Sequence, residues 1–425
     1  MIKDLIDLKR KLLHNVMKSQ IGKIQINDEV YVADLQTDLK TVFLVKIIDF
    51  RLRQSETIDI AIGLFEGLGK VTLVSGYASS GSFGNLDIQT FDFQYLIKGI
   101  QFLNIADIKS NICSFESEIL KKVFNDTIIF SGGIEGELSK KPVRLLENDR
   151  FKINFYNGLN SRVTREMHYT ARQYKYLSIK SIGGSLPIWD LLQIAGRFKK
   201  LIYLLGFGDG DNVDIFTFIL YENRKKQRFQ LYGWDYKLPR TKFNILNIHE
   251  ITFTEYFNKE MVEKWIFSED YQKLFDILFE RHFLKQVSPE NAFLNSIFAL
   301  ERFYRTFVKQ IKNSLNSKIK YFTDIFRQVL PPDVETSNYL NRLEITRHSL
   351  SHFEDKPTAF IGIDLLYASV YVEAVLIISL LKNIGVSSEQ IASLTQNTRG
   401  SISDMYYLNK ALRFSYPSDL FSKNQ

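Results

Sequence analysis

The stretch Tyr339-Leu-Asn-Arg-Leu-Glu-Ile-Thr-Arg-His-Ser-Leu-Ser-His-Phe353 decides how the C-terminal third of this chain folds. Its apolar positions recur at three- and four-residue spacing and lie on one side of a helix that turns about 100° per residue. They are Leu343, Thr346, Leu350 and Phe353. This stripe predicts a helix over residues 335–353 that packs one face against neighbouring helices.

Two histidines lie away from that stripe, and an arginine lies at its edge. His348 and His352, two of the six histidines in the chain, are one turn apart on roughly the opposite face. Arg347 lies at the edge of the stripe. A lone histidine is usually structural, but a pair off the apolar face beside an arginine indicates a functional site. Ile345 shares the histidine side, which suggests that a second subunit covers this face.

The segments around this helix predict a bundle. Ser288-Pro289-Glu290 is a helix-start signature, with Ser as N-cap and Pro at the first position. Pro331-Pro332 and Gly385 mark helix ends. Helices are expected over residues 289–313, 318–329, 335–353 and 362–383, with a fifth from about residue 388. The fourth is apolar almost all round and is expected at the centre.

In the N-terminal region, apolar and polar residues instead alternate in the two-residue period of strands. The predicted strands include residues 24–26, 30–32, 58–62, 71–74, 91–95, 151–155, 176–179, 214–218 and 228–232. Pro187 opens one helix, over residues 188–205. Many short strands separated by Gly, Asn and Ser predict an antiparallel sandwich or barrel. The fold class is therefore α+β, with a β-rich domain over 1–240, a helical linker over 241–287 and a helical bundle over 288–425.

Composition narrows the functional classes. The 425 residues contain one cysteine, Cys113, which excludes an intramolecular disulfide and a Cys-based zinc site and fits a reducing cytosol. The first 20 residues carry too many charges for a secretory signal and predict a short amphipathic helix. The longest apolar run, Ala374–Leu381, is too short to span a membrane.

The net charge of +7 is unevenly placed. Six basic residues and no acidic one lie between Arg302 and Thr323. A solvated helix face is the ordinary explanation for such a run. If a catalytic site lies nearby, the run is a candidate track for RNA phosphates, and its leading members are Arg302, Arg305, Lys309 and Lys312.

The segment Arg347-His348-x-x-x-His352 resembles the motif of HEPN domains, in which an arginine, a polar residue and a later histidine lie on a helix of a small bundle. The resemblance covers about residues 288–414. A large β-rich region before such a domain is similar to the ApeA-type anti-phage proteins, and this resemblance implies that residues 1–240 form a sensor or regulatory domain. The resemblance implies metal-independent RNA cleavage by 2′-OH attack, without a cofactor, by an abortive-infection toxin in the cytoplasm. His352 would take the acid/base role, Arg347 would bind phosphate and His348 would assist.

Helical geometry adds a condition to that site. Residues five apart on a straight helix point about 140° apart, so Arg347 and His352 of one chain do not face the same phosphate. The family's arrangement, in which motifs of two protomers converge, predicts a homodimer. Glu301 and Glu373 are possible supporting residues that could pair with Arg347 or a histidine, although a structural ion pair is an equal reading for both. The implied partners are RNA, with tRNA as one candidate, and a phage-derived trigger, but no membrane.

Other chemistries fit the sequence less well. The histidine pair has the spacing of a metal site, but Ser349 stands where a zincin needs Glu, and no third ligand is evident. Residues 206–211 carry three glycines in the wrong context for a dinucleotide loop, and residues 209–214 lack calcium-loop spacing. The sequence predicts a turn there. Two non-catalytic alternatives stay open: a silent HEPN scaffold that binds nucleic acid, and a dimeric interaction protein with a ligand-binding β-sandwich.

Overall fold

The structure, a computed structural model, divides into two compact units. It describes residues 18–39, 42–48, 57–80, 88–116, 120, 136–139, 142–163, 169–204, 215–222, 225–234, 258–283, 287–308, 314–330 and 334–391. A β-rich unit comprises Met1–Lys121, Thr127–Ala195 and Asp211–Tyr236, and a helical unit comprises Lys122–Asp126, Gly196–Gly210 and Lys237–Gln425.

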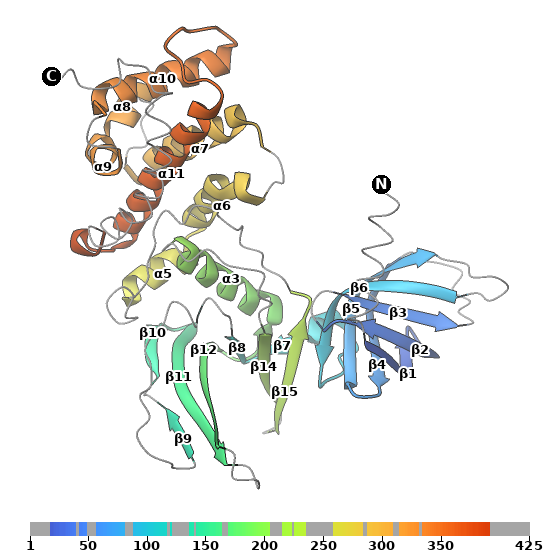
Figure 1. The fold of residues 1–425 in the computed structure, drawn as a ribbon. Coiled ribbons are helices and arrows are strands. Elements are labelled where there is room, and N and C mark those ends of the chain that lie inside the picture. The colour runs from blue at the N-terminus through green and yellow to red at the C-terminus, as the bar shows by residue number, and fades with distance from the viewer. Residues whose placement is uncertain are drawn as a thin grey trace. The chain divides into compact units, whose positions relative to one another are not determined.

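The β-rich unit begins with a closed six-stranded barrel (Figure 1). Its strands are β1 (Lys18–Ile26), β2 (Glu29–Thr37), β3 (Phe43–Ile48), β4 (Thr57–Phe65), β5 (Gly69–Ser80) and β6 (Ile88–Lys98). They pair antiparallel in the order β6-β3-β2-β1-β4-β5, and β5 pairs again with β6, which closes the circle. Of the sandwich and barrel predicted from the sequence, the barrel is therefore the form confirmed for this segment.

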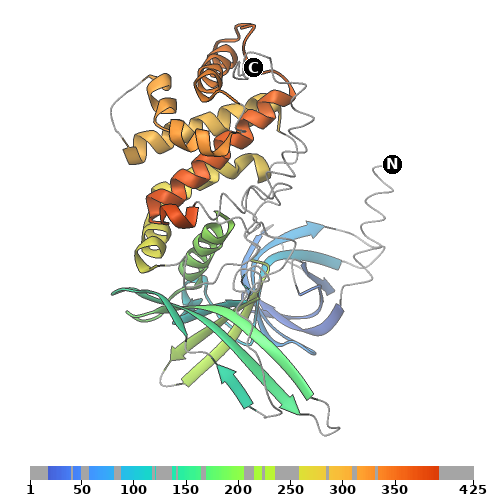
Figure 2. The ribbon, with the colours of Figure 1, turned by 60° about the vertical axis from the view of Figure 1, so that its left-hand side comes forward.

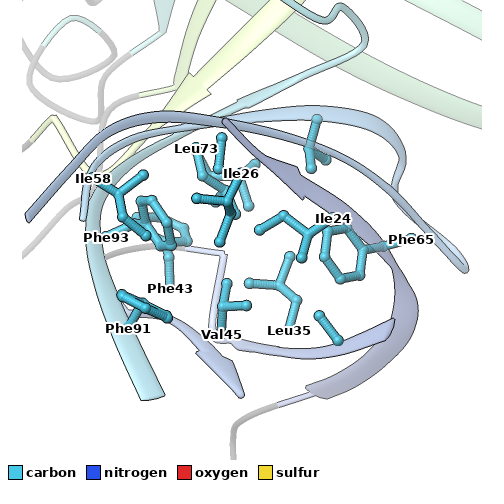
Figure 3. Packing of buried hydrophobic residues seen from close by; sticks show 14 of the residues in the cluster. Ile24, Ile26, Leu35, Phe43, Val45, Ile58, Phe65, Leu73, Phe91 and Phe93 are labelled. Atoms are coloured by element: carbon cyan, nitrogen blue, oxygen red, sulfur yellow. The ribbon is translucent and has the colours of Figure 1, made fainter. Parts of the chain in front are cut away.

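Every second side chain along each strand points into the barrel and fills its interior. Ile24 and Ile26 point inward from β1, while Ile21 on the same strand is 62% exposed. Figure 3 shows the inward side chains of the strands meeting in one apolar core. Side chains fill the interior of small barrels in this way, because every second residue of each strand faces inward.

A second, open sheet continues from the barrel. Its strands are β8 (Ile112–Glu116), β9 (Gly136–Ser139), β10 (Val143–Glu147), β11 (Phe151–Val163), β12 (Tyr169–Ser181), β14 (Ile215–Glu222) and β15 (Lys225–Tyr232). They run in the order β10-β11-β12-β8-β14-β15, with β9 on β11. The last residues of β6 also pair with β15, which joins barrel and sheet. The short strands β7 (Lys109–Ser110) and β13 (Leu186–Pro187) form a separate pair ahead of α3 (Ile188–Leu204).

The helical unit contains the bundle that the sequence predicted (Figures 1 and 2). Its helices beyond α3 are α5 (Lys259–Phe267), α6 (Glu269–Phe283), α7 (Pro289–Phe303), the π-helix η2 (Tyr304–Val308), α8 (Leu315–Lys320), α9 (Thr323–Val329), α10 (Thr336–His352) and α11 (Ile363–Ile384). The long α11 packs along α7 and α9, and α10 contacts α7, α8 and α9. Ser288 caps α7 by accepting from the amide of Asn291, as its sequence signature predicted.

The apolar helix α11 also has the composition of a membrane span. Its segment Asp364–Ile384 is long and apolar enough to cross a membrane, whereas the run Ala374–Leu381 alone is too short to do so. However, 83% of its most apolar window is buried inside the protein. Its apolarity is therefore that of the central helix of a bundle.

Three helix predictions need correction. The helix expected over 289–313 ends as an α-helix at Phe303 and continues as a π-helix to Val308. The helix expected over 318–329 is two helices, because the chain turns at Tyr321 and Phe322 and sends the Phe322 ring onto Phe303. Phe353 was expected in the buried stripe of α10 but is 97% exposed, because the helix ends before it.

Several predicted features lie outside the described residues. They are the N-terminal amphipathic helix, the glycine-containing turn over residues 206–211, and the fifth C-terminal helix beyond its first turn at residues 388–391.

Candidate functional site

The C-terminal half of α10 carries the motif and is fixed from its buried side. Leu343 and Thr346 are fully buried. The Thr346 hydroxyl donates to the carbonyl of Arg342 (2.7 Å) and accepts from the amide of Phe360 (2.9 Å) in the segment that follows the helix. This pair of hydrogen bonds ties that segment to the helix one and a half turns before its end.

The helix ends directly after the second histidine. Phe353 adopts the left-handed conformation (φ 55°, ψ 38°), and its amide donates to the carbonyl of Ser349. The amide of Glu354 donates to the same carbonyl (3.1 Å). A left-handed cap of this kind satisfies helix-end carbonyls and turns the chain away. His352 therefore occupies the last helical position.

The two histidines lie together on the exposed side of α10. Their ring centroids are 4.4 Å apart, and 51% of the His348 side chain is exposed. His348 Nε2 lies 3.7 Å from a carboxylate oxygen of Glu354. The Lys356 ammonium, which donates to that carboxylate, holds the pKa of Glu354 below its usual value, and positive charge on the histidines adds to this effect. Solvent, and hence a substrate, can reach both rings.

Arg347 points to a different neighbour. Its guanidinium Nη2 lies 3.6 Å from Oε1 of Glu301 on α7. The other oxygen of Glu301 accepts from Lys318 of α8 (2.6 Å) and from Arg305 of the π-helix (3.2 Å). Three cations from three elements thus surround one carboxylate that is 7% exposed. We call these four residues the Glu301 cluster.

The structure brings some predicted site residues together and separates others. Of the two supporting candidates, Glu301 contacts Arg347. Glu373 is buried in α11, and the contacts described for Arg347 and the two histidines do not include it. Arg305 joins the Glu301 cluster, and Arg302 is half-buried near the end of α7. Lys309 and Lys312 lie outside the described residues.

Lys318 is the residue of this cluster that sequence reasoning did not single out. It was one of six basic residues in a run interpreted as a solvated face, yet it is 4% exposed. A signal was available, because Phe322 and Phe326 follow it at four-residue spacing and both are fully buried. That spacing places Lys318 on the core side of the segment.

No metal site is evident in the part of the chain that the structure describes. Within it, no three His, Cys, Asp or Glu residues gather as ligands for an ion. The contacts described for the histidine pair are those between the two rings and the one from His348 to Glu354.

Two family models match the chain. The model described as ApeA N-terminal domain 1 matches residues 19–265, more than half of the 425 residues. The chain belongs to the ApeA family. The model described as Apea-like HEPN matches residues 244–390 of this ApeA-like protein. The matched segment contains the Glu301 cluster and both histidines. Neither a curated protein nor a solved structure matches the chain.

The two matches support a functional class. HEPN domains usually belong to ribonucleases, and ApeA-type proteins are anti-phage proteins, so the class is a nuclease role in defence. The matched segments overlap between residues 244 and 265, which include the start of α5. The domain boundaries at residues 240 and 287 stay predictions.

Proposed function

We propose that this ApeA-like protein is a metal-independent endoribonuclease and acts in the cytoplasm as an abortive-infection toxin against phage. The observation that carries the proposal is the exposed His348–His352 pair at the end of α10, next to Arg347, inside the HEPN match. An imidazole titrates near neutral pH and an arginine stays charged, which are the two properties that RNA cleavage without a metal requires.

The proposed reaction uses the RNA's own hydroxyl. The ribose 2′-OH loses its proton to an imidazole and attacks the adjacent phosphorus, while the bond from phosphorus to the 5′-oxygen breaks. An imidazolium returns a proton to that oxygen, so the products are a 2′,3′-cyclic phosphate and a 5′-hydroxyl. We assign His352 the acid/base role, and His348 orients or assists it. Arg347 binds the phosphate oxygens as charge builds on them.

A second copy of the chain completes the proposed site. In one chain, Arg347 approaches α7 while the histidines lie on the exposed side of α10. Phe353 and Ile361, exposed at 97% and 74%, lie near the two ends of the segment that joins α10 and α11. Apolar side chains this exposed favour a protein contact at that place. We therefore propose a homodimer in which the motifs of two protomers face one RNA strand.

The deciding assay is RNA cleavage in EDTA, with tRNA and an unstructured RNA as substrates. We expect the wild-type protein to cleave and to leave cyclic phosphate ends. Arg347→Ala and His352→Ala should each lose about 100-fold or more in rate, because each removes a group that acts on the reacting phosphate. Arg327→Ala is the matched control, since Arg327 is an exposed arginine of α9 that pairs with Asp324.

Two outcomes would count against the proposal. Cleavage by Arg347→Ala and His352→Ala at the wild-type rate would mean that a contaminant or another site cuts the RNA. Tight RNA binding by a wild-type protein that never cleaves would favour the silent HEPN scaffold instead.

A further inference from the structure

Lys318 has a place in the Glu301 cluster that the proposed chemistry does not use. Only 5% of its side chain is exposed, and its ammonium lies 2.6 Å from Oε2 of Glu301. A buried lysine is costly to fold unless it is paired, and a buried glutamate is as well. The pair links α8 to α7 at the same carboxylate that Arg347 faces, so Lys318 can influence how the Arg347 guanidinium is oriented.

The two carboxylate oxygens of Glu301 have different partners. Oε2 accepts from both Lys318 and Arg305. Oε1 is buried and lies 3.6 Å from Arg347, beyond hydrogen-bond distance, and it accepts no hydrogen bond within the described part of the chain. The Nε atom of Arg347 is likewise buried without a hydrogen-bond partner. Among the residues that the structure describes, Arg347 is thus held near Glu301 by charge, and no hydrogen bond joins the two side chains.

We propose that Lys318 is a positioning residue for the nuclease site. By binding Oε2, it turns the Glu301 carboxylate away from a two-pronged ion pair with Arg347. The guanidinium is then oriented by Glu301 but able to take an RNA phosphate. This inference rests on the proposed function, in which Arg347 is the phosphate-binding residue.

Charge and geometry explain why Lys318 matters more than Arg305. The three cations and one carboxylate leave a net charge of +2, which attracts phosphate. Without Lys318, Glu301 would face Arg347, whose planar fork fits a carboxylate through two parallel hydrogen bonds. The Arg305 side chain is 60% exposed, so water screens its attraction for Glu301 and it would not replace Lys318.

The test uses Lys318→Met, which keeps the length of the side chain and removes its charge. We expect its kcat for RNA cleavage to fall by about 10-fold or more, because Arg347 becomes committed to Glu301. The double variant Glu301→Gln/Lys318→Met removes the competing carboxylate and should recover to within about 3-fold of Glu301→Gln alone. Lys264→Met is the matched control, since Lys264 of α5 is an exposed lysine that also pairs with a glutamate, Glu260, and lies outside the basic run.

A second readout is independent of cleavage. The Nε–H signal of Arg347 in a ¹H–¹⁵N NMR spectrum should move downfield in Lys318→Met, as it gains a hydrogen bond to Glu301, and return in the double variant. Binding of an uncleavable 2′-O-methyl RNA should lose about one unit of salt dependence in Lys318→Met, since one phosphate contact is lost.

These readouts separate the two proposals. If the wild-type protein does not cleave RNA, the nuclease proposal fails, while the NMR signal and the salt dependence still test Lys318. Equal impairment of Lys318→Met and the double variant, with an unmoved Arg347 signal, would make Lys318 purely structural and overturn the inference. If Lys318→Met does not fold, the double variant, in which both members of the buried pair are neutral, takes its place: inactivity of the folded double variant, beside an active Glu301→Gln, overturns the inference.

Discussion

At the scale of single residues, Phe353 is the most unusual position beside the motif. It combines a positive φ of 55° with a side chain that is 97% exposed. An L-residue in the left-handed region is strained relative to glycine, and glycine is the common residue at such helix ends. A phenylalanine at this position therefore lowers the stability of the folded monomer, and its exposed ring can contact another molecule.

Phe353→Gly should stabilise the monomer by about 1 kcal/mol, because it relieves the left-handed strain. Urea unfolding at low protein concentration measures this. Phe353→Ala keeps a Cβ and is the matched control, which we expect to show no such gain. If the ring lies in the proposed dimer contact, both variants should also weaken dimerisation in sedimentation experiments. Unchanged stability in Phe353→Gly would contradict the strain.

At the scale of elements, the Thr346 hydroxyl is one of the groups on α10 that bind the segment leading to α11, beside Arg342, which donates to the carbonyl of Ala359. Thr346 is fully buried and accepts the amide hydrogen of Phe360. A buried amide that loses its acceptor is destabilising, because water cannot replace the bond. The segment that follows His352 is thus held to the helix by a side chain one and a half turns earlier.

Thr346→Val keeps the shape and removes that acceptor. We expect a loss of about 1–3 kcal/mol in unfolding free energy and faster hydrogen exchange at the Phe360 amide. Thr346→Ser keeps the hydroxyl, so its Phe360 amide should stay protected even though a methyl group is lost. Equal exchange rates in the two variants would show that the hydroxyl does not hold this segment.

At the scale of the whole molecule, the proposed site spans two chains. If Arg347 of one protomer works with His352 of its partner, a mixed dimer of Arg347→Ala and His352→Ala chains contains one intact site. Each variant alone contains none. Complementation between two inactive proteins is therefore the signature of a shared site.

Mixing the two inactive variants should restore about a quarter of wild-type activity, since random exchange makes half of the dimers mixed and each has one of two sites intact. Native mass spectrometry verifies that mixed dimers form. Mixed dimers without activity would mean that Arg347 and His352 of the same chain serve one site.

The site illustrates what the sequence alone could predict. The 3.6-residue period placed His348 and His352 off the apolar stripe, and the structure has both on the exposed side of α10. The same period gave a wrong prediction for Phe353. It applies only while the helix continues, and α10 ends in a left-handed cap at Phe353 itself. It also missed the break at Tyr321 and Phe322, where a tertiary contact with Phe303 overrides a local pattern.

The sequence by itself determined the type and facing of most elements: the alternating strands, the central apolar helix α11, and a motif helix with two polar residues opposite its buried side. These are local properties, because side-chain period follows from backbone geometry within one element. Only the tertiary structure decided that β5 closes on β6 into a barrel, and that Glu301, Lys318 and Arg347 meet from three helices. Such contacts join residues far apart in the chain, and their energy depends on burial and mutual geometry that no local pattern contains.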